Sequence, residues 1–232
     1  MAGSVAVVIP VYNEERTIES VIQQVLLQPC VREVVVVDDC STDGTARVLD
    51  SIRQKLDRVK TTRHAVNQGK GAALRTGFAL AAAPIVLVQD ADLEYDPADY
   101  ERLIQPIVAG KADVVFGSRF LGQGAHRVLY YWHSVGNRVL THFSNVFTNL
   151  NLSDMECGYK VFSKPVLDRL RIEEERFGFE PEIVCKVARL GVRVYEVPIS
   201  YHGRTYAEGK KIGWRDGVRA FYSIVKFGLR GQ

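Results

Sequence analysis

Short apolar runs alternate with longer segments of helical periodicity in the first half of the chain. The runs are rich in β-branched residues, which suits strands buried on both faces of a parallel sheet. Between them apolar residues recur at helical spacing, as in the segment from Ile18 to Val25. The pattern predicts strands at 5–9, 33–37, 59–62, 85–89 and 113–116, and helices at 17–28, 45–56, 71–83 and 97–109. Strands that alternate with helices predict an α/β fold whose central sheet is mostly parallel and flanked by helices.

The pattern changes beyond Gly124. A long amphipathic segment at 130–150 lacks strand alternation and predicts a helix, and the compact stretch 153–160 follows it. We predict further helices at 179–190 and 214–229, with a strand at 192–199 between them and a polar loop at 201–213. At 232 residues, 47% hydrophobic and 25% charged, the chain has the size and composition of one large globular domain.

Charge is spread unevenly along the chain. The formal net charge is only +3, but residues 201–232 hold seven Lys or Arg against two acidic residues. Such a basic tail indicates an anionic partner such as phosphate, nucleic acid or a lipid headgroup. The four cysteines show neither a C-x-x-C pair nor zinc-ligand spacing, which indicates reduced thiols in an intracellular protein. We find no signal peptide, and the longest nearly apolar run, 77–88, is too short to span a bilayer, so we expect a protein that is soluble or bound to a membrane surface.

Carboxylates gather where the predicted strands end. Glu14 follows the first strand, Asp38 and Asp39 follow the second, and Asp90 and Asp92 follow the fourth. Ligands of open α/β sheets bind outside the carboxyl ends of the strands, so these acids are expected at one ligand-binding edge.

The spacing of Asp90 and Asp92 favours a metal ion. Two residues apart on an extended backbone, both carboxylates project to the same side. Mg²⁺ and Mn²⁺ bind a few carboxylates and complete their coordination with water and phosphate oxygens. The alternative is a solvated acidic loop, because Asp96 and Pro97 form a good N-cap and first position for the next helix.

Several common site motifs are absent from the sequence. The first strand runs into Pro-Val-Tyr-Asn-Glu rather than G-x-G-x-x-G, so no glycine cradle for a dinucleotide is present. Asn-Gln-Gly-Lys-Gly at 67–71 lacks the Walker spacing, and no H-E-x-x-H or G-x-S-x-G motif occurs. Carboxylates and a metal ion remain as the candidate chemistry.

Four short motifs occur in a specific order, at 8–14 (VIPVYNE), 37–45 (VDDCSTDGT), 67–71 (NQGKG) and 90–92 (DAD). In that order and spacing the chain resembles the family 2 glycosyltransferases, which have the GT-A nucleotide-diphospho-sugar transferase fold. Gly-Ser-Arg at 117–119, Gly-Asn at 136–137 and the stretch 154–160 are similar to the branch of dolichyl-phosphate mannose and polyprenyl-phosphate glucose synthases. The resemblance implies one catalytic domain over 1–232, with a nucleotide-sugar-binding half at 1–117 and an acceptor-binding half at 118–232.

The resemblance also implies roles for individual residues. It assigns the nucleotide sugar to Pro10, Tyr12, Glu14, Asp38, Asp39, Lys70 and Asp90. It implies Mg²⁺ or Mn²⁺ as the cofactor, held by Asp90 and Asp92, with Glu94 as a third ligand or an outer-shell group. Three of these residues have structural alternatives, since Pro10 can simply end a strand, Tyr12 can pack, and Lys70 can be an exposed lysine at a helix start.

For catalysis the resemblance implies Asp92 together with Arg204 and Lys211, although Lys210 competes with Lys211 for that position. The acceptor phosphate is assigned to Arg119, Ser134 and Arg138, because a guanidinium group binds phosphate bidentately. A lipid phosphate is already an anionic nucleophile. An alcohol acceptor would need a general base, for which Asp154 and Glu156 are the candidates by family position.

The implied reaction moves a hexose, with inversion, from a UDP- or GDP-sugar to a polyprenyl or dolichyl phosphate, with no nucleic acid partner. The alternatives are a soluble hydroxyl acceptor and a non-catalytic subunit that only binds sugar nucleotides. The last predicted helix combines Trp214, Phe221, Ile224 and Val225 with four basic residues, so it resembles an interfacial helix. We therefore expect a cytoplasmic protein with peripheral contact to the membrane, unless that helix packs on the sheet.

Overall fold

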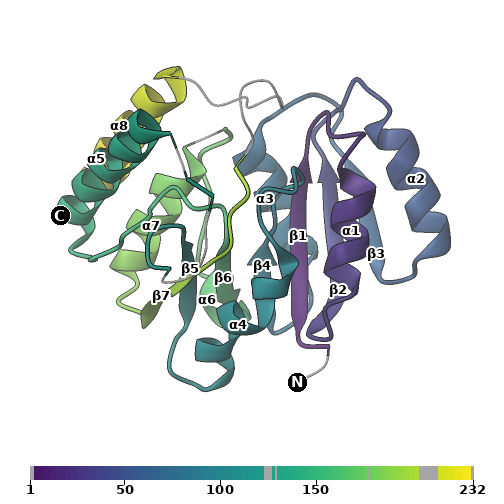
Figure 1. Ribbon diagram of the computed structural model, residues 1–232, viewed down its shortest axis with the longest axis horizontal. Coiled ribbons are helices and arrows are strands. Elements are labelled where there is room, and N and C mark those ends of the chain that lie inside the picture. The colour runs from purple at the N-terminus through teal and green to yellow at the C-terminus, as the bar shows by residue number, and fades with distance from the viewer. Residues whose placement is uncertain (1–2, 123–126, 129, 177, 204–213, 231–232) are drawn as a thin grey trace.

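The computed structural model describes residues 3–122, 127–128, 130–176, 178–203 and 214–230, with side chains of the last range from 217 onward. Seven strands form one sheet in the order β3-β2-β1-β4-β6-β5-β7, and helices cover both of its faces (Figure 1). The strands are β1 (Val5–Val11), β2 (Val31–Asp38), β3 (Val59–Arg63), β4 (Ile85–Val88), β5 (Val114–Ser118), β6 (Lys160–Ser163) and β7 (Val194–Pro198). The helices are α1 (Ile18–Leu26), α2 (Thr45–Lys55), α3 (Lys70–Leu80), η1 (Pro97–Asp99), α4 (Tyr100–Val108), α5 (Tyr131–Thr148), α6 (Lys164–Leu167), α7 (Phe179–Arg189) and α8 (Trp214–Leu229).

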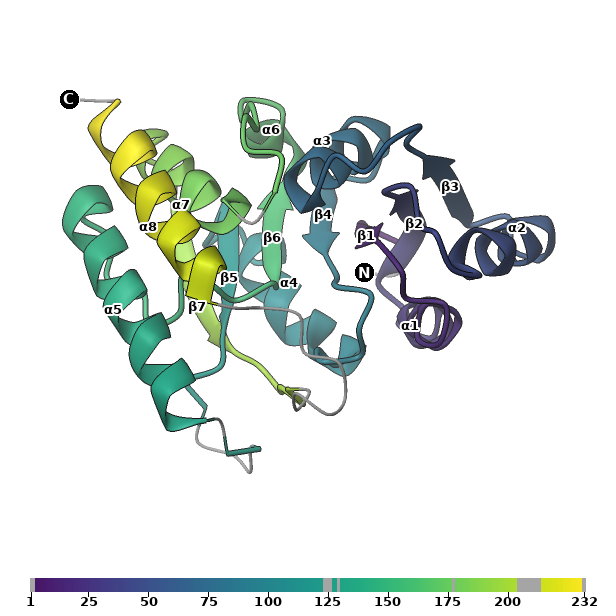
Figure 2. The ribbon, with the colours of Figure 1, turned by 90° about the horizontal axis from the view of Figure 1, so that it is seen from above.

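The two faces of β1 build two separate cores. Val5, Val7 and Ile9 point into a core shared with α1, α2 and α4. Ala6 and Val8 point to the opposite side, where α3, α7 and α8 pack. Figure 2, which looks along the sheet from above, shows these two layers of helices. A strand covered on both faces needs apolar residues at every position, which explains the continuous apolar runs of the sequence.

The predicted α/β fold is confirmed, and the sheet is mixed. β1 runs parallel to β2 and β4, and β5 runs parallel to β7. β6 is antiparallel to both β4 and β5, and the sequence pattern did not predict it. It has four residues and begins with Lys160, a fully buried lysine whose Nζ donates hydrogen bonds to the carbonyl oxygens of Met155 and Cys157. A lysine at such a position interrupts the apolar run that marks a buried strand.

Other parts of the fold differ in smaller ways from the predicted elements. The helix predicted at 97–109 is divided into η1 and α4. The short α6, which starts with Lys164 and Pro165, was not predicted. The expected division of the chain after residue 117 falls inside β5, so strands of both expected halves share one sheet.

α8 packs on the protein along one side. Ala220, Ile224 and Phe227 are buried, and Ile224 belongs to the core formed with α3 and α7. Part of the apolar side of α8, which the sequence analysis expected to contact a membrane, therefore packs against the protein. The ring of Phe221 stacks on Phe143 of α5 at 4.4 Å between centroids, which joins the two helices. Among the described residues, no helix is both long enough and apolar enough to cross a membrane.

Candidate active site

The carboxyl ends of β1, β2 and β4 meet at one edge of the sheet. Val11 is paired with Asp38, and Val8 is paired with Val88, so the three strands end close to one another. Pro10 lies within β1, and the exposed Tyr12 directly follows that strand. The loops after the strand ends line the upper edge in Figure 1. The residues that the sequence placed on a common edge are therefore brought together there.

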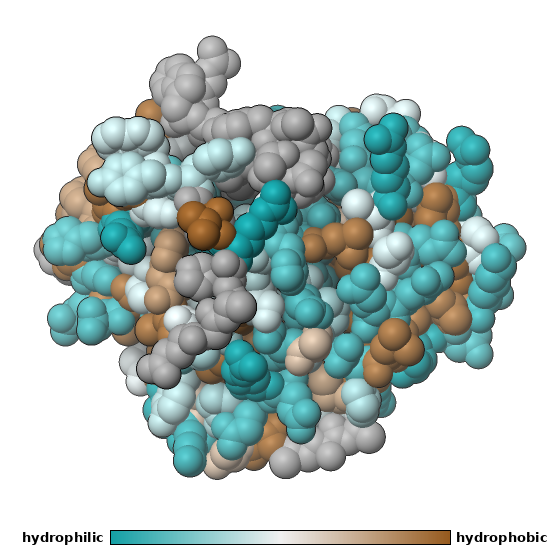
Figure 3. Space-filling view, in the orientation of Figure 1, coloured by the Kyte–Doolittle hydropathy of each residue, from teal (hydrophilic) through white to brown (hydrophobic). Residues whose placement is uncertain are grey.

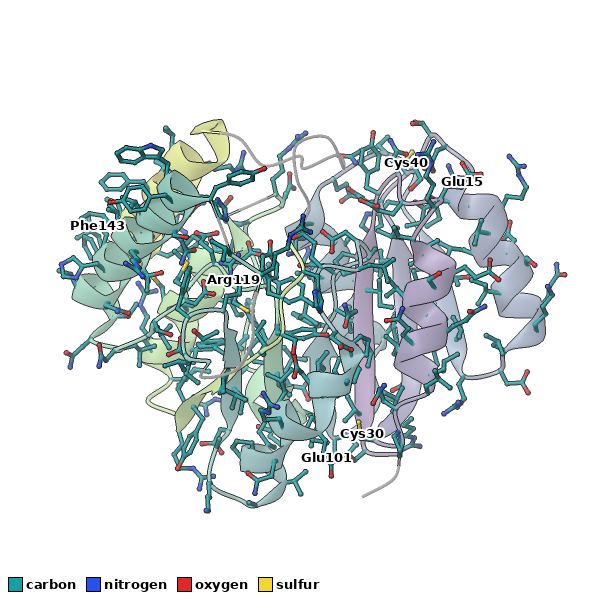
Figure 4. All side chains as sticks on the ribbon, viewed as in Figure 1. Glu15, Cys30, Cys40, Glu101, Arg119 and Phe143 are labelled. Carbon is teal, nitrogen blue, oxygen red and sulfur yellow. The ribbon has the colours of Figure 1, made fainter. Side chains whose placement is uncertain are left out.

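Each of these three strands is followed by a non-glycine residue in the left-handed region. The φ angles are 54° at Asn13, 62° at Cys40 and 62° at Leu93. This conformation costs about 1–2 kcal/mol for a residue with a side chain. Hydrogen bonds between the loops hold it in place, for example from the backbone NH of Thr42 to Asn13 Oδ1 at 2.8 Å. Figure 4 shows Cys40 and Glu15 at this edge. Backbone strain that is concentrated in this way is typical of ligand-binding loops.

The two adjacent aspartates at the end of β2 have different surroundings. Asp39 is buried, and its carboxylate lies 2.8 Å from His64 Nδ1 and accepts hydrogen bonds from the backbone NH groups of Gln68 and Gly69. It thus fixes the loop that leads into α3. Asp38 Oδ1 accepts a hydrogen bond from the backbone NH of Ser41 in the same loop. Asp38 Oδ2 is buried near the guanidinium group of Arg63 but accepts no hydrogen bond of good geometry.

Lys70 joins β4 to α7 through two ion pairs. Its Nζ lies 2.8 Å from Asp90 Oδ1 and 2.9 Å from Glu180 Oε1. Burial alone would lower the pKa of Lys70, but the two carboxylates outweigh burial and raise that pKa above its usual range. Lys70 is therefore a fixed cation beside Asp90. Sequence reasoning missed Glu180, because an acid in the first turn of a helix, next to Pro181, is typical of an ordinary helix start.

Glu94 connects the loop after β4 to the segment after β7. Its Oε2 accepts a hydrogen bond from the Tyr201 hydroxyl at 2.7 Å, and its carbonyl oxygen accepts one from the backbone NH of His202 at 2.8 Å. Burial and the adjacent Glu94 carboxylate raise the pKa of Tyr201, so this hydroxyl stays a donor. The described part of this segment ends at Gly203. The expected catalytic residues Arg204 and Lys211, and the competing Lys210, lie outside the described residues.

The Asp90 and Asp92 carboxylates fit Mg²⁺ or Mn²⁺ by their chemistry and by the space around them. Gly158 lies against Asp90, and a Cβ atom on Gly158 would come within 2.3 Å of Asp90 Oδ2. Asp92 Oδ1 accepts a hydrogen bond from the backbone NH of Glu94 at 3.2 Å, which orients it within the same loop. Across the described ranges, no three His, Cys, Asp or Glu side chains group as a ready metal site. A pair of carboxylates that shares its ion with substrate oxygens is a usual arrangement for Mg²⁺.

The predicted acceptor residue Arg119 forms an internal ion pair. Its Nε and Nη2 each lie 2.7 Å from one oxygen of the fully buried Asp154. Asn137 of α5 contacts both partners, since its Oδ1 accepts from Arg119 and its Nδ2 donates to Asp154. Figure 4 shows Arg119 within the second half of the sheet. Both Asp154 oxygens are thus engaged, and the Arg119 side chain, only 6% exposed, is buried together with its counter-ion.

Ser134 and Arg138, the other predicted acceptor residues, lie on α5 on either side of Asn137. Ser134 is half-buried, and its backbone NH donates to Tyr130 in the first turn of the helix. Arg138 is exposed, and its guanidinium carbon lies 5.8 Å from the centre of the Phe120 ring. The guanidinium carbon of Arg119 also lies 5.8 Å from the centre of that ring, so Phe120 lies near both guanidinium groups.

Glu156 has an unusual environment for a carboxylate. Its Oε1 is buried, with no hydrogen-bond partner. Burial, and then the negative charge of Glu180, raise the pKa of Glu156 from its ordinary 4.5 to about 8. A buried polar atom that lacks a partner, on a group with a displaced pKa, is a feature of sites that handle protons or ligands.

Comparison with known proteins adds a family and a fold. Residues 6–171 match the family described as Glycosyl transferase family 2. Undecaprenyl-phosphate mannosyltransferase of Micrococcus luteus is 30% identical to the chain, over 98% of the chain and 95% of the relative. Glycosyltransferase AglD of Haloferax volcanii is 29% identical over 85% of the chain, which spans only 33% of that larger protein. The structure of glucosyl-3-phosphoglycerate synthase from Mycobacterium tuberculosis in complex with uridine diphosphate superposes with a TM-score of 0.75, at 22% identity, over 97% of this chain and 80% of that one.

Proposed function

Because the chain belongs to glycosyl transferase family 2 and has the GT-A fold, we propose that it transfers a hexose from a UDP- or GDP-sugar to a polyprenyl or dolichyl phosphate, using Mg²⁺ or Mn²⁺. The observation that carries the proposal is the set of Asp90, Asp92 and Lys70 at the carboxyl edge of the sheet. Two carboxylates beside a fixed ammonium group suit a metal-bound diphosphate. A hydroxyl-bearing ligand without phosphate would leave the metal ion and the ammonium group of Lys70 without an anionic ligand group to bind.

In the proposed reaction Asp90 and Asp92 hold the metal, and Tyr12, Glu14 and Asp38 contact the nucleoside. When bound, Mg²⁺ or Mn²⁺ neutralises the charge that grows on the leaving diphosphate. In this reaction Lys70 donates to a diphosphate oxygen, and its ion pair with Glu180 supports that role by holding the ammonium group in place. Arg204 and Lys211 are assigned to the same diphosphate. Asp39 acts indirectly, because it positions the loop that precedes Lys70.

A phosphate acceptor suits the surface next to this site. Residues 114–153 contain no Asp or Glu, although the chain holds 27 of them. Arg119, Ser134 and Arg138 all belong to that stretch, so an anionic acceptor approaches without repulsion from it. The name of the Micrococcus luteus relative supports a lipid phosphate for this chain too, and peripheral contact with a membrane would follow from such an acceptor.

Release of nucleoside diphosphate tests the proposal. A panel of UDP- and GDP-hexoses is incubated with Mn²⁺, with and without a short water-soluble polyprenyl phosphate. We expect one donor to be used, with release that depends on the acceptor and stops with EDTA. Asp92→Ala should lower the rate by about two to three orders of magnitude, because transition-state charge is no longer neutralised.

Asp50→Ala is the matched control, since Asp50 lies exposed on α2. It should keep the rate of the native chain. An Asp92→Ala rate equal to that of Asp50→Ala would overturn the metal assignment. Release that an alcohol stimulates and a polyprenyl phosphate does not would overturn the acceptor assignment.

Glu156 favours a second candidate, transfer to a soluble hydroxyl acceptor. A hydroxyl needs a base, and a carboxyl group with a pKa near 8 and an unpartnered oxygen is suited to take its proton. With a hydroxyl acceptor the rate should rise with pH up to about 8 and fall strongly in Glu156→Gln. With a lipid phosphate as acceptor, Glu156→Gln should leave the rate nearly unchanged.

A further inference from the structure

α5 and α8 each carry an apolar stripe on the side that faces away from the protein. On α5 the stripe consists of Trp132, Val139 and Val146, at intervals of seven residues. On α8 it consists of Val218, Tyr222 and Leu229, at intervals of four and seven. These spacings place each set on one side of its helix. All six side chains, which we call the α5–α8 face, are more than half exposed.

The two stripes belong to one surface. Phe143 of α5 stacks on Phe221 of α8, and four residues further along α5 Phe147 lies against Gly228. Both contacts advance in the same chain direction, so the helices are parallel and side by side, as Figures 1 and 2 also show. Figure 3 shows pale and brown side chains among hydrophilic ones at its left side, where α5 lies in front of α8.

Such a surface is unusual for a protein that stands alone in water. Two of the large apolar side chains exposed elsewhere, Leu27 and Val66, each lie singly in a loop. Six on two adjacent helices form a contiguous apolar area, and areas of this kind mark contact with a protein or a membrane.

Charge and aromatic content indicate which partner covers it. α5 lies within the stretch 114–153, which has no acidic residue, and it contributes Arg138 and His142. Tyr130, Tyr131 and Trp132 gather where α5 begins, and all three are exposed. Tyrosine and tryptophan rings of this kind prefer the level of lipid headgroups.

We propose that the α5–α8 face docks on an anionic lipid bilayer, with the rings of Tyr131 and Trp132 at the headgroup level. This deepens the proposed function and in part rests on it, because Trp132 lies five residues before Asn137, which touches Arg119. Five helical residues span about 7.5 Å, so a phosphate near Arg119 would lie close to the membrane plane.

A second copy of the chain fits the face less well. A symmetric dimer places the same patch against itself, so Arg138 and His142 of one copy would meet those of the other. The stretch around α5 has no carboxylate to pair with them. The basic residues Arg219, Lys226 and Arg230 of α8 already pair with Glu174 and Glu173 of their own chain.

Fluorescence on vesicles tests the docking directly. Trp214→Phe leaves Trp132 as the only tryptophan of the full chain, which has two. Vesicles of phosphatidylcholine and phosphatidylglycerol, without any polyprenyl phosphate, should shift the emission of Trp132 to shorter wavelength. Lipids brominated near the headgroup should quench that emission. Emission that neither shifts nor is quenched would overturn the proposal.

Co-sedimentation with the same vesicles supplies the second measurement. The double variant Val139→Asp/Val146→Asp should lower the bound fraction at least tenfold. Leu27→Asp is the matched control, because Leu27 lies outside the face and is more exposed than either valine, and it should bind as the native chain does. A double variant that binds as well as Leu27→Asp would overturn the proposal. Light scattering that shows a dimer, returned to a monomer by the double variant, would also overturn it in favour of a second copy.

Failure of the proposed function would look different. The vesicles contain no acceptor, so their binding does not depend on turnover. Nucleoside diphosphate release with the short water-soluble polyprenyl phosphate, without vesicles, should be unchanged in the double variant. Vesicle binding that persists while no polyprenyl phosphate supports release would remove the proposed reaction and leave the docking surface in place.

Discussion

The absence of a side chain at Gly158 leaves space for the Asp90 carboxylate, and adding one methyl group at Gly158 tests whether that space matters for binding. A Cβ atom on Gly158 would lie 2.3 Å from Asp90 Oδ2, so Gly158→Ala must displace that carboxylate. We expect the affinity for a nucleoside diphosphate with Mn²⁺ to fall at least tenfold, as measured by calorimetric titration. Gly136→Ala is the control, because nothing lies within 4 Å of its Cβ position. Equal affinities of the two variants would contradict this account of Asp90.

Glu156 predicts a specific dependence of stability on pH. Its pKa is about 8 in the folded protein and 4.5 in an ordinary carboxyl group. Between these values the folded state keeps a proton that the unfolded state releases, so stability falls as the pH rises from about 4.5 to 8. Glu156→Gln has no proton to lose there. Its free energy of unfolding, relative to that of the native chain, should therefore increase across this range in urea titrations.

The exposed Glu101, changed to Gln, should show no such trend and serves as the control for that measurement. A Glu156→Gln difference that stays constant from pH 5 to pH 8 would show that Glu156 is ionised throughout.

The sequence predicts site residues where a local rule applies. Asp90 and Asp92 follow the buried strand β4, whose carboxyl end lies at the ligand edge, although Ala91 and Asp92 lie in a turn and not on the extended backbone that the spacing argument assumed. Glu180 obeys no such rule, because its role arises from Lys70, which lies 110 positions earlier in the chain. The pairing of Arg119 with Asp154 likewise joins positions 35 residues apart, so its burial and its partner emerge only from the fold.

At the scale of elements, Glu174 holds α8 against the body of the protein. Burial tends to raise the pKa of Glu174, but hydrogen bonds from Lys226 and Arg219 outweigh it and lower that pKa. Glu174→Gln should therefore loosen α8, and we expect amide exchange in that helix to lose about 1–2 kcal/mol of protection. The adjacent exposed Glu175, changed to Gln, is the matched control. Undiminished protection of α8 would assign its attachment to apolar packing alone.

Elements with a long periodic pattern or a continuous apolar run were predictable, whereas β6 and α6 were not. The segment at 214–229 was predicted as a helix, and α8 has these bounds. β6 has only four residues, and tertiary contacts decide its state, since it lies between β4 and β5 and hides the ammonium group of Lys160 within the protein. β4 is equally short and was predicted, because all four of its residues are apolar, whereas β6 begins with a lysine and ends with a serine.

At the scale of the whole molecule, ligand binding should appear as heat stability. A nucleoside diphosphate at 100 times its Kd stabilises the folded state by about 2.7 kcal/mol. For a chain of this size that raises Tm by about 5–10 °C. We expect the rise only when Mn²⁺ is present, and Asp92→Asn should remove it in differential scanning calorimetry. The exposed Asp50, changed to Asn, should keep the rise, and an equal rise with EDTA would contradict a shared metal site.

The position of β6 in the sheet has a consequence for synthesis on the ribosome. β4 is complete at residue 88, but its neighbour on one side is β6, which begins at residue 160. A nascent chain that has already folded β1 to β4 therefore keeps one edge of a strongly apolar strand unpaired while some seventy further residues emerge. Open edges of this kind attract other chains. Cells that make this protein fast must shield that edge, and slower translation between the two strands should raise the yield of folded enzyme.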